Sequence, residues 1–394
     1  MTRGPAAART ERRGPRRARL RAGVPVVRER AAAAFLALTL LALDGDQRLS
    51  AQQSPTDLMI QSRSQEQPQP SARRIALPPG NPLEVLPVQG NVFLIAGGPS
   101  NIAVQIGPEG VLLVDAGTAE MSEKILEAIH VLSDRPINYI IDTTPDKDHY
   151  GGNEKLGAAG INPTVAQLGL TGRGSTAVEN QGGGNNPQSL RPQGAIVFAN
   201  ENFLNRMSAP TGETPVEPFA LWPTSTFFTR SKTISFNDEA IEMLHVPAAH
   251  TDGDVMAFFR KSDVVATGDI INTLQYPFVD HKRGGTIQGV LDALNDVIEI
   301  TVPRFNQMAG TRVVPGHGRI LNEADVVEYR DMMTIIRDRV KLAIDAGKTR
   351  QQIKAMRATL DYDGLYSVPS WTGEMLVDTI DDELRQPAVP ATAR

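Results

Sequence analysis

One unit recurs four times along this chain and constrains its fold more than any other feature. In each copy, a short apolar segment ends in a glycine-containing turn that carries histidine or aspartate. Apolar segments bounded by glycine and proline are typical of buried strands. The strands of a sheet can bring such turns together at a common edge, so the sequence predicts a metal site at the rim of a sheet. The candidate metal ligands are Asp146, Asp148, His149, His250, Asp269 and His317.

The stretch Asp142–Asn153 carries the densest group of these residues. It follows the apolar run Ile137–Ile141, which is predicted to be a buried strand, and supplies three potential ligands within four positions. Gly151 and Gly152 come next, and glycine lets the backbone turn tightly and approach an ion closely. Aspartate, asparagine and glycine are also ordinary turn residues. This stretch therefore defines a metal site only together with the other three turns.

The absence of cysteine narrows the ligand chemistry. Without thiolates or disulfides, any metal must be held by histidine, aspartate, glutamate, other oxygen ligands or water. The chain has only six histidines, and three of them lie in the recurring turns.

A formal net charge of −5 gives no reason to expect a nucleic-acid partner. Ligands on several strands of one sheet keep their geometry without the metal, which suits catalysis.

The N-terminal residues 1–51 resemble a secretory signal peptide. An arginine-rich start leads into the apolar block Ala31–Leu43, which is short for a membrane span, and Leu49–Ala51 offers small residues for cleavage. The alternative interpretation is a disordered basic tail with an incidental alanine run. We expect export, to the periplasm or outside the cell, with residues 52–76 as a flexible linker. No other apolar segment is long enough to span a bilayer, so we expect no membrane span in the mature form.

Residues 77–345 are predicted to form one α/β domain. We expect strands at Leu83–Val88, Val92–Ala96, Asn101–Ile106, Val111–Val114, Ile241–Val246, Val255–Phe259, Val264–Ala266 and Arg312–Val314, and helices at Met121–Leu132, Ile287–Ile300 and Ala324–Asp345. Residues 158–235 are predicted to be an irregular insertion, either a cover for the site or a plain loop. Residues 346–394 are predicted to form a helical extension packed on the domain, with Thr372 capping its last helix.

The motifs, in their order along the chain, resemble those of the metallo-β-lactamase-fold hydrolases. The resemblance runs from about residue 83 to residue 345. Asp115–Gly117 resembles the turn that supports the metal site, and Asp142–Gly152 resembles the histidine-rich loop of that family. His250–Asp254, Gly268-Asp269 and Pro315–Gly318 resemble its later ligand-bearing turns. The resemblance implies a four-layered αββα sandwich with C-terminal helices and with the site at one edge of the paired sheets.

Two positions depart from the family pattern, because Thr144 and Asp146 stand where its first two histidines are expected. The resemblance implies that the altered set would hold one ion with His250 and Asp269, and that an intact set would hold another. The intact set is Asp148, His149, Asp269 and His317. Asp146 can still coordinate, whereas neutral Thr144 is a weak ligand. We therefore expect one or two Zn²⁺ ions, with iron or manganese as alternatives because a carboxylate hardens the site.

The activity implied by the resemblance is metal-dependent hydrolysis. A metal-activated water would attack a small-molecule substrate of the ester, lactone, thioester or amide type. Asp148 is the catalytic candidate, because it can orient that water, whereas Asp115 is expected to be structural. Two alternatives stay open: a catalytically altered relative that binds a metal or ligand, and a non-haem iron oxidoreductase. Oxidoreductases of this family use the ligand set that is altered here. The sequence makes no prediction of oligomeric state.

Overall fold

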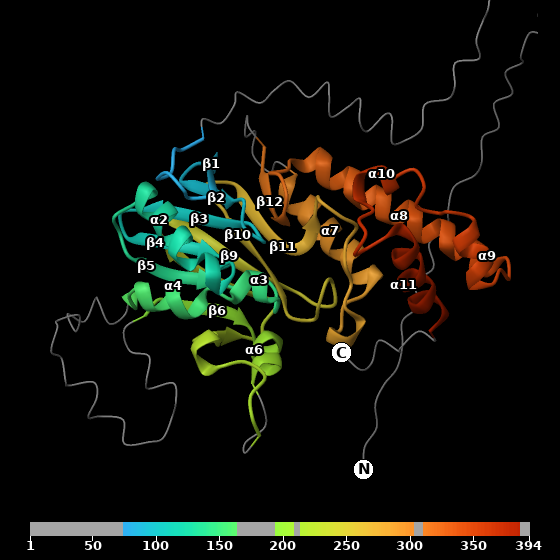
Figure 1. Cartoon of the computed structure of the whole chain (residues 1–394), viewed down its shortest axis with the longest axis horizontal. Helices are drawn as coiled ribbons and strands as arrows, with labels where there is room; N and C mark the ends of the chain where they lie inside the picture. Colours follow the sequence, from blue (N-terminus) through green and yellow to red (C-terminus); the bar gives the residue numbers. More distant parts are fainter. Residues whose placement is uncertain (1–73, 164–193, 209–212, 303–309, 387–394) are drawn as a thin grey trace, which may run out of the picture. The chain divides into compact units, whose positions relative to one another are not determined.

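The computed structural model describes residues 74–163, 194–208, 213–302 and 310–386 (Figure 1). The predicted leader at 1–51 and most of the predicted linker at 52–76 lie outside these ranges, so both remain predictions. Among the helices in the described ranges, none is both long enough and apolar enough to cross a membrane.

The first sheet has seven strands in chain order. They are β1 (Glu84–Gln89), β2 (Val92–Ala96), β3 (Ile102–Gly107), β4 (Gly110–Val114), β5 (Ile137–Ile141), β6 (Ile196–Asn200) and β7 (Ser225–Phe227). Strands β1 to β4 pair antiparallel, and β4 to β7 pair parallel. Loops that leave the carboxyl ends of parallel strands meet at one edge of a sheet, where ligand sites commonly form.

The second sheet has five strands in the order β12-β11-β10-β9-β8. They are β8 (Ser231–Phe236), β9 (Glu239–Val246), β10 (Asp254–Phe259), β11 (Val264–Asn272) and β12 (Arg312–His317). Only β11 and β12 pair parallel within this sheet. As a result, the carboxyl ends of these two strands lie side by side, with Asn272 opposite His317.

Helices lie between and after the strands. They are η1 (Ala119–Met121), α2 (Ser122–Leu132), α3 (Lys147–Tyr150), α4 (Asn153–Ala159), α6 (Glu201–Met207), η3 (Phe219–Leu221), η4 (His281–Arg283), α7 (Ile287–Thr301), α8 (Glu323–Asp345), α9 (Arg350–Ala355), α10 (Asp363–Tyr366) and α11 (Gly373–Arg385). The side chain of Thr372 accepts a hydrogen bond from Met375 N, so the predicted cap is confirmed. The predicted irregular segment 158–235 contains β6, α6 and β7, and its residues 164–193 and 209–212 lie outside the described ranges.

The two faces of strand β4 pack into two different apolar layers of the core. Leu112 and Val114 point into an apolar cluster between the two sheets, whereas Val111 and Leu113 join a cluster that includes residues of α2. Successive side chains of a strand point to opposite faces, so a strand that is apolar throughout must be covered on both sides. Residues of α7, α8 and α11 pack with the second sheet in a third cluster. The two sheets therefore lie between helical layers, which confirms the αββα sandwich with C-terminal helices.

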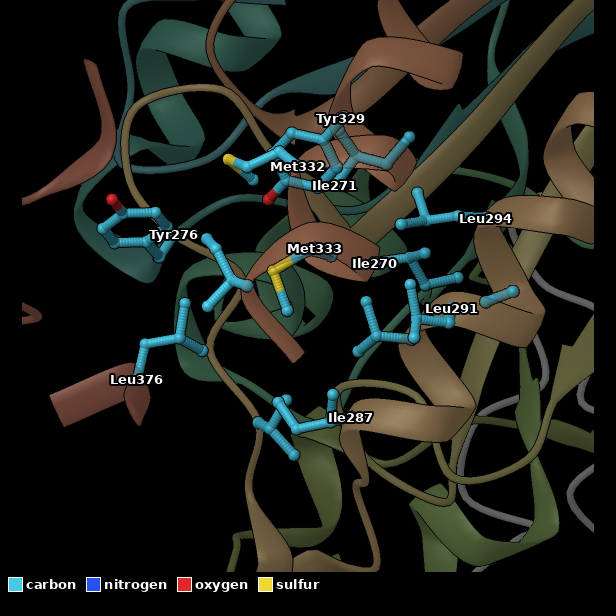
Figure 2. Packing of buried hydrophobic residues seen from close by; sticks show 14 of the residues in the cluster. Ile270, Ile271, Tyr276, Ile287, Leu291, Leu294, Tyr329, Met332, Met333 and Leu376 are labelled. Atoms are coloured by element: carbon cyan, nitrogen blue, oxygen red, sulfur yellow. The ribbon is translucent and has the colours of Figure 1, made fainter. Parts of the chain in front are cut away.

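The third cluster anchors the strand that carries Asp269. Figure 2 shows Ile270 and Ile271 of β11 among side chains of α7 and α8, including Leu291 and Met333. Each fully buried side chain of this type stabilises the fold by about 1.5–3 kcal/mol relative to exposure. Tyr329 of α8 adds a polar contact, because its hydroxyl accepts a hydrogen bond from Asn272 N at 3.4 Å. The neighbours of Asp269 along the chain are thus held by packing that needs no metal.

Strand β11 is longer than the sequence predicts. The expected turn at Gly268-Asp269 lies inside the strand, which continues to Asn272 with irregular pairing around Gly268. The backbone φ of Gly268 is +52°, and a Cβ there would lie 2.4 Å from Thr143 Oγ1. Glycine is required at this position because it tolerates both the left-handed conformation and the close approach. A glycine-aspartate pair in the sequence does not distinguish a turn from such an irregularity within a continued strand.

Candidate metal centre

The structure brings all six predicted ligands to one edge of the paired sheets. Three of them lie at or just before α3 in the loop after β5, one follows β9, one lies within β11 and one ends β12. A pocket of about 320 Å³ opens at this edge. It is lined by Asp146, Asp148, His250, Asp269, Asn272, Leu274, Gln275, Phe278 and His317. His149 is fully buried at the same place.

Asp148, His149 and His317 form one group whose donor atoms all lie within 4.8 Å of one another, called here the histidine cluster. Oδ1 of Asp269 faces this cluster, 3.2 Å from Nε2 of His149 and 3.0 Å from Nε2 of His317. Oδ2 of Asp148 lies 3.5 Å from Nε2 of His317. Two imidazole nitrogens and two carboxylates therefore converge on one point, a donor set suited to zinc.

Asp115 holds the ring of His149 from behind. Its Oδ2 lies 2.8 Å from Nδ1 of His149, while its carboxylate also accepts hydrogen bonds from the backbone and hydroxyl of Thr143. With Nδ1 donating to a carboxylate, Nε2 of His149 is directed toward the histidine cluster. Such a carboxylate partner orients a metal-binding histidine and raises its basicity. The contacts of Asp115 thus agree with the structural role expected from the sequence.

Two buried atoms at this point are incompletely satisfied within the described residues. Nε2 of His149 and Oδ1 of Asp269 are buried, and neither makes a hydrogen bond of acceptable geometry with any described residue. Buried polar atoms nearly always have a hydrogen-bond partner, so an exception calls for a bound ion or water molecule. The residues around the histidine cluster therefore fit a bound metal ion.

The electrostatics of the cluster favour positive charge. Burial alone would lower the pKa of His149, but the charges of Asp269 and Asp115 outweigh it and raise that pKa well above the usual value. The pKa of His317 is likewise raised, because Asp269 overcomes the effect of burial. Burial would raise the pKa of Asp269, but His149 and His317 hold it well below the usual value. Positive charge is stabilised at the point where a cation would bind.

Residues before β3 position two of the ligands, a role that the sequence interpretation missed. Nδ2 of Asn101 donates to the backbone oxygens of Pro315 and Gly318, both at 2.9 Å, and so clamps the turn that carries His317. The hydroxyl of Ser100 donates to the backbone oxygen of Asp148. Both residues lie in a polar turn whose sequence does not differ from an ordinary connection between strands, so no local signal identifies them.

Asp146, His250 and Asp269 form a second group, called here the aspartate cluster. Nε2 of His250 lies 2.6 Å from Oδ2 of Asp146 and 3.9 Å from Oδ2 of Asp269, so the two oxygens of Asp269 face different clusters. Nδ1 of His250 donates to the backbone oxygen of Phe278 at 2.8 Å. Burial would lower the pKa of His250, but the hydrogen bond to Asp146 and nearby charges raise it to about 9. His250 is therefore a cation at neutral pH when no metal is bound.

Thr144 does not face this second group. Its side chain is fully buried, and its hydroxyl donates to Oδ1 of Asp254 at 3.1 Å. Asp254 also accepts hydrogen bonds from the backbone and hydroxyl of Thr251. The position that would carry the first family histidine has become part of a buried hydrogen-bonded network behind the pocket.

Arg283 reaches the aspartate cluster instead, and the sequence interpretation did not identify it. Its Nη1 lies 2.7 Å from Oδ1 of Asp146. Burial would raise the pKa of Asp146, but His250 and Arg283 lower it to about 2. The neighbouring His281 is exposed, and its Nδ1 donates to the backbone oxygen of Gly285 at 3.0 Å. The glycine pair Gly284-Gly285, which directly follows Arg283, is the local signal that could have pointed to it.

The remaining pocket wall is partly apolar. The side chains of Leu274 and Phe278 are 60% and 39% exposed, although both lie beside the predicted ligands. Phe278 packs edge-on against Trp371, with ring centroids 4.9 Å apart. Asn272 and Gln275 supply neutral polar groups to the same wall. A ligand in this pocket would meet charged groups on one side and apolar surface on another.

The fold and the convergent donor set together define a class of metallo-hydrolase-like proteins. The family model described as the metallo-beta-lactamase superfamily matches residues 87–317, and the chain belongs to that superfamily. Members of the superfamily include metal-dependent hydrolases such as sulfatases and β-lactamases. The match covers every predicted ligand, from Asp146 to His317.

A solved sulfatase structure agrees at the level of the fold. The stereoselective inverting sec-alkylsulfatase Pisa1 from Pseudomonas sp. matches with a TM-score of 0.54 and 14% identity, over 76% of this chain and 50% of that protein. The chain thus spans about half the length of the sulfatase. A metallo-beta-lactamase from Pontibacter korlensis matches with a TM-score of 0.43 and 16% identity, over 64% of this chain and 99% of that protein. No curated protein matches the chain.

Proposed function

We propose that this protein is a metal-dependent hydrolase that acts on a small-molecule ester, lactone, thioester or amide. The observation that carries the proposal is the histidine cluster with Asp269 Oδ1, in which two buried donor atoms lie 3.2 Å apart without a hydrogen bond of good geometry among the described residues. Asp148, His149, Asp269 and His317 would hold the ion. Zn²⁺ suits this mixture of imidazole and carboxylate, and iron or manganese are the alternatives.

The ion would supply Lewis acidity, lowering the pKa of a water molecule and polarising the bond to be broken. Asp148 is the protein group placed to orient that water. Its side chain is 31% exposed and lines the pocket, so it can accept a hydrogen bond from a molecule there. Imidazolium His250 also lines the pocket, with its two N–H groups engaged by Phe278 O and Asp146, and contributes positive charge to the pocket wall.

The substrate is proposed to combine a polar scissile group with an apolar portion. The pocket is of small-molecule size, and the exposed side chains of Leu274 and Phe278 supply apolar surface at its wall. Apolar side chains beside a polar site commonly bind the non-reacting part of a ligand. We further propose that the protein acts in the periplasm or outside the cell, on the signal-peptide pattern of residues 1–51.

Metal analysis tests the proposal most directly. Protein purified without added metal should contain a transition metal by mass spectrometry, or take one up after treatment with a chelator. His317→Ala should remove most of the bound metal and abolish hydrolysis. His130→Ala, at an exposed position on α2, is the matched control and should change neither. Protein that binds no transition metal under any of these conditions would overturn the proposal.

A substrate panel tests the reaction class. It should contain chromogenic esters, lactones, thioesters and amides, each with a short and a long apolar group. A secondary alkyl sulfate belongs in the panel because Pisa1 is a sec-alkylsulfatase. We expect metal-dependent turnover of at least one member, faster with the longer apolar group. Oxygen consumption with bound iron, and no hydrolysis, would favour an oxidoreductase instead.

A further inference from the structure

Arg283 supplies a positive charge inside the aspartate cluster. Its Nη1 lies 2.7 Å from Oδ1 of Asp146, and the other oxygen of that carboxylate lies 2.6 Å from Nε2 of His250. Both oxygens of Asp146 are therefore already paired with cationic groups. A carboxylate bound in this way is a poor ligand for a further cation, because the ion would have to displace the guanidinium.

Hydrogen bonds to its own loop and to a neighbouring loop fix the position of the Arg283 side chain. Its Nε donates to Asp280 Oδ2 at 2.7 Å, and its Nη1 also donates to Pro145 O at 2.9 Å. Asp280 N in turn donates to the backbone oxygen of His250 at 3.0 Å. The loop thus joins the turn of Asp146 to the turn of His250, and the guanidinium lies between fixed partners on both.

Close backbone packing explains the two glycines that follow Arg283. Gly284 has a φ of +82°, and a Cβ at Gly285 would lie 2.1 Å from the backbone oxygen of His250. Only glycine tolerates these positions without displacing the loop. The backbone oxygen of Arg283 also accepts hydrogen bonds from Asp252 N at 2.9 Å and Arg206 Nη2 at 2.8 Å. The arginine is therefore held by contacts at both its backbone and its side chain.

The donor set of the aspartate cluster is correspondingly poor. Thr144 is turned toward Asp254, which leaves Asp146, His250 and Oδ2 of Asp269. Asp146 and His250 are hydrogen-bonded to each other, and Asp146 also forms an ion pair with Arg283. In contrast, the donor atoms of the histidine cluster lie against one another, with Oδ1 of Asp269 3.2 Å from Nε2 of His149 and 3.0 Å from Nε2 of His317. The two groups therefore differ in that a guanidinium is paired with a carboxylate of the aspartate cluster.

We infer that Arg283 takes the place of the superfamily's other metal ion, so that this protein holds a single ion, at the histidine cluster. Asp146 then acts as a positioning residue: it bridges Arg283 and His250 and is not a metal ligand. The inference rests on the proposed function, because it assumes that the histidine cluster binds an ion. We therefore expect one ion, where the sequence predicted one or two, because Arg283 excludes the second.

The test is a metal titration of chelator-treated full-length protein with Zn²⁺, followed by calorimetry and mass spectrometry, and with Co²⁺, followed by its visible spectrum. We expect wild-type protein to bind one equivalent tightly. Arg283→Gln removes a positive charge from the second site and should bind a second equivalent ~10-fold or more tightly than wild-type protein binds any second ion. Arg283→Lys retains the charge and should bind one. Arg230→Gln removes an exposed arginine that pairs with Asp296, 2.6 Å away, and is the matched control.

A separate variant tests which cluster binds the single ion. Asp146→Asn should keep the single tight equivalent, whereas loss of that equivalent would place the ion in the aspartate cluster and overturn the inference. Arg283→Met, which keeps the apolar stem, replaces Arg283→Gln if circular dichroism shows that the glutamine variant is unfolded.

The remaining outcomes are distinguishable. Two tight equivalents in wild-type protein would overturn the inference and leave the proposed hydrolase intact. One equivalent in wild-type protein and still one in folded Arg283→Gln and Arg283→Met would also overturn it, because the arginine would then not be what excludes the second ion. Wild-type protein that binds no ion would defeat the proposed function itself.

Discussion

Nδ1 of His149 lies 2.8 Å from Oδ2 of Asp115, and both residues are buried. Asp115 adopts a positive φ of 69° at the end of β4, so the backbone conformation there is part of the arrangement. The carboxylate that ends one strand thereby orients an imidazole from the loop after the next strand. This pair connects the first sheet to the histidine cluster.

Asp115→Asn should weaken metal binding without removing a ligand. The amide retains the shape of the side chain but loses the charge that directs Nε2 of His149 toward the cluster, so we expect affinity to fall by about 10–100-fold. Competition with a chromophoric chelator measures the change. Asp134→Asn, at an exposed position after α2, is the control. Unchanged affinity in Asp115→Asn would show that the orientation of His149 does not depend on this carboxylate.

The stability of the metal-free protein should fall as pH rises through the range set by His250. The pKa of His250 is about 9 in the folded protein against an ordinary 6.5. The folded state therefore binds more protons than the unfolded state between these values, and the stabilisation is complete below pH 6.5 and lost as pH rises through 9. The loss is on the order of 3 kcal/mol.

Urea denaturation of chelator-treated protein across this pH range measures the effect. His250→Gln should flatten the dependence, although part of the slope should remain because the pKa values of His149 and His317 are also raised. His130→Gln, outside the site, should leave the slope unchanged. An identical slope in wild-type and His250→Gln protein would contradict the assignment.

Leu274→Gln should impair substrate binding more than chemistry. Leu274 is 60% exposed and lines the pocket, so the substitution removes apolar contact without disturbing the core. We expect KM to rise by about threefold to tenfold, with kcat nearly constant, on the best substrate with a long apolar group. Leu360→Gln, at a 50% exposed leucine away from the pocket, is the matched control. A fall in kcat alone would argue against a binding role.

Glu383→Ala should destabilise the fold by detaching α11 from α7. The two carboxylate oxygens of Glu383 accept hydrogen bonds from Ile287 N at 2.6 Å and Gln288 N at 3.1 Å, the first amides of α7. Loss of these contacts should lower the free energy of unfolding by about 1–2 kcal/mol. Thermal and urea denaturation measure it, with Glu374→Ala as the control because that side chain is 72% exposed. Equal stability of the two variants would be the contrary result.

Most strands could be predicted because apolar runs bounded by turn residues are local signals. Val92–Ala96 and Ile137–Ile141 have the same bounds in the structure as in the sequence prediction. The bounds of β11 could not be predicted, because its continuation past Gly268 depends on pairing with β12, which is distant in the chain. Likewise, the helix after Thr372 was predictable from its cap, whereas the contact of Glu383 with α7 was not.

The sequence by itself determined the donor types, their order along the chain and the two departures at Thr144 and Asp146. These are properties of residue identity and spacing, and they sufficed to predict a metal site at the rim of a sheet. The sandwich was implied by the resemblance of the motifs to those of the metallo-β-lactamase-fold hydrolases. Only the tertiary structure decided what each donor contacts. Asp146 meets Arg283, a residue far along the chain, because two loops from different strands pack together. Whether a carboxylate can accept a metal depends on its other partners in space, and spacing along the chain does not encode them.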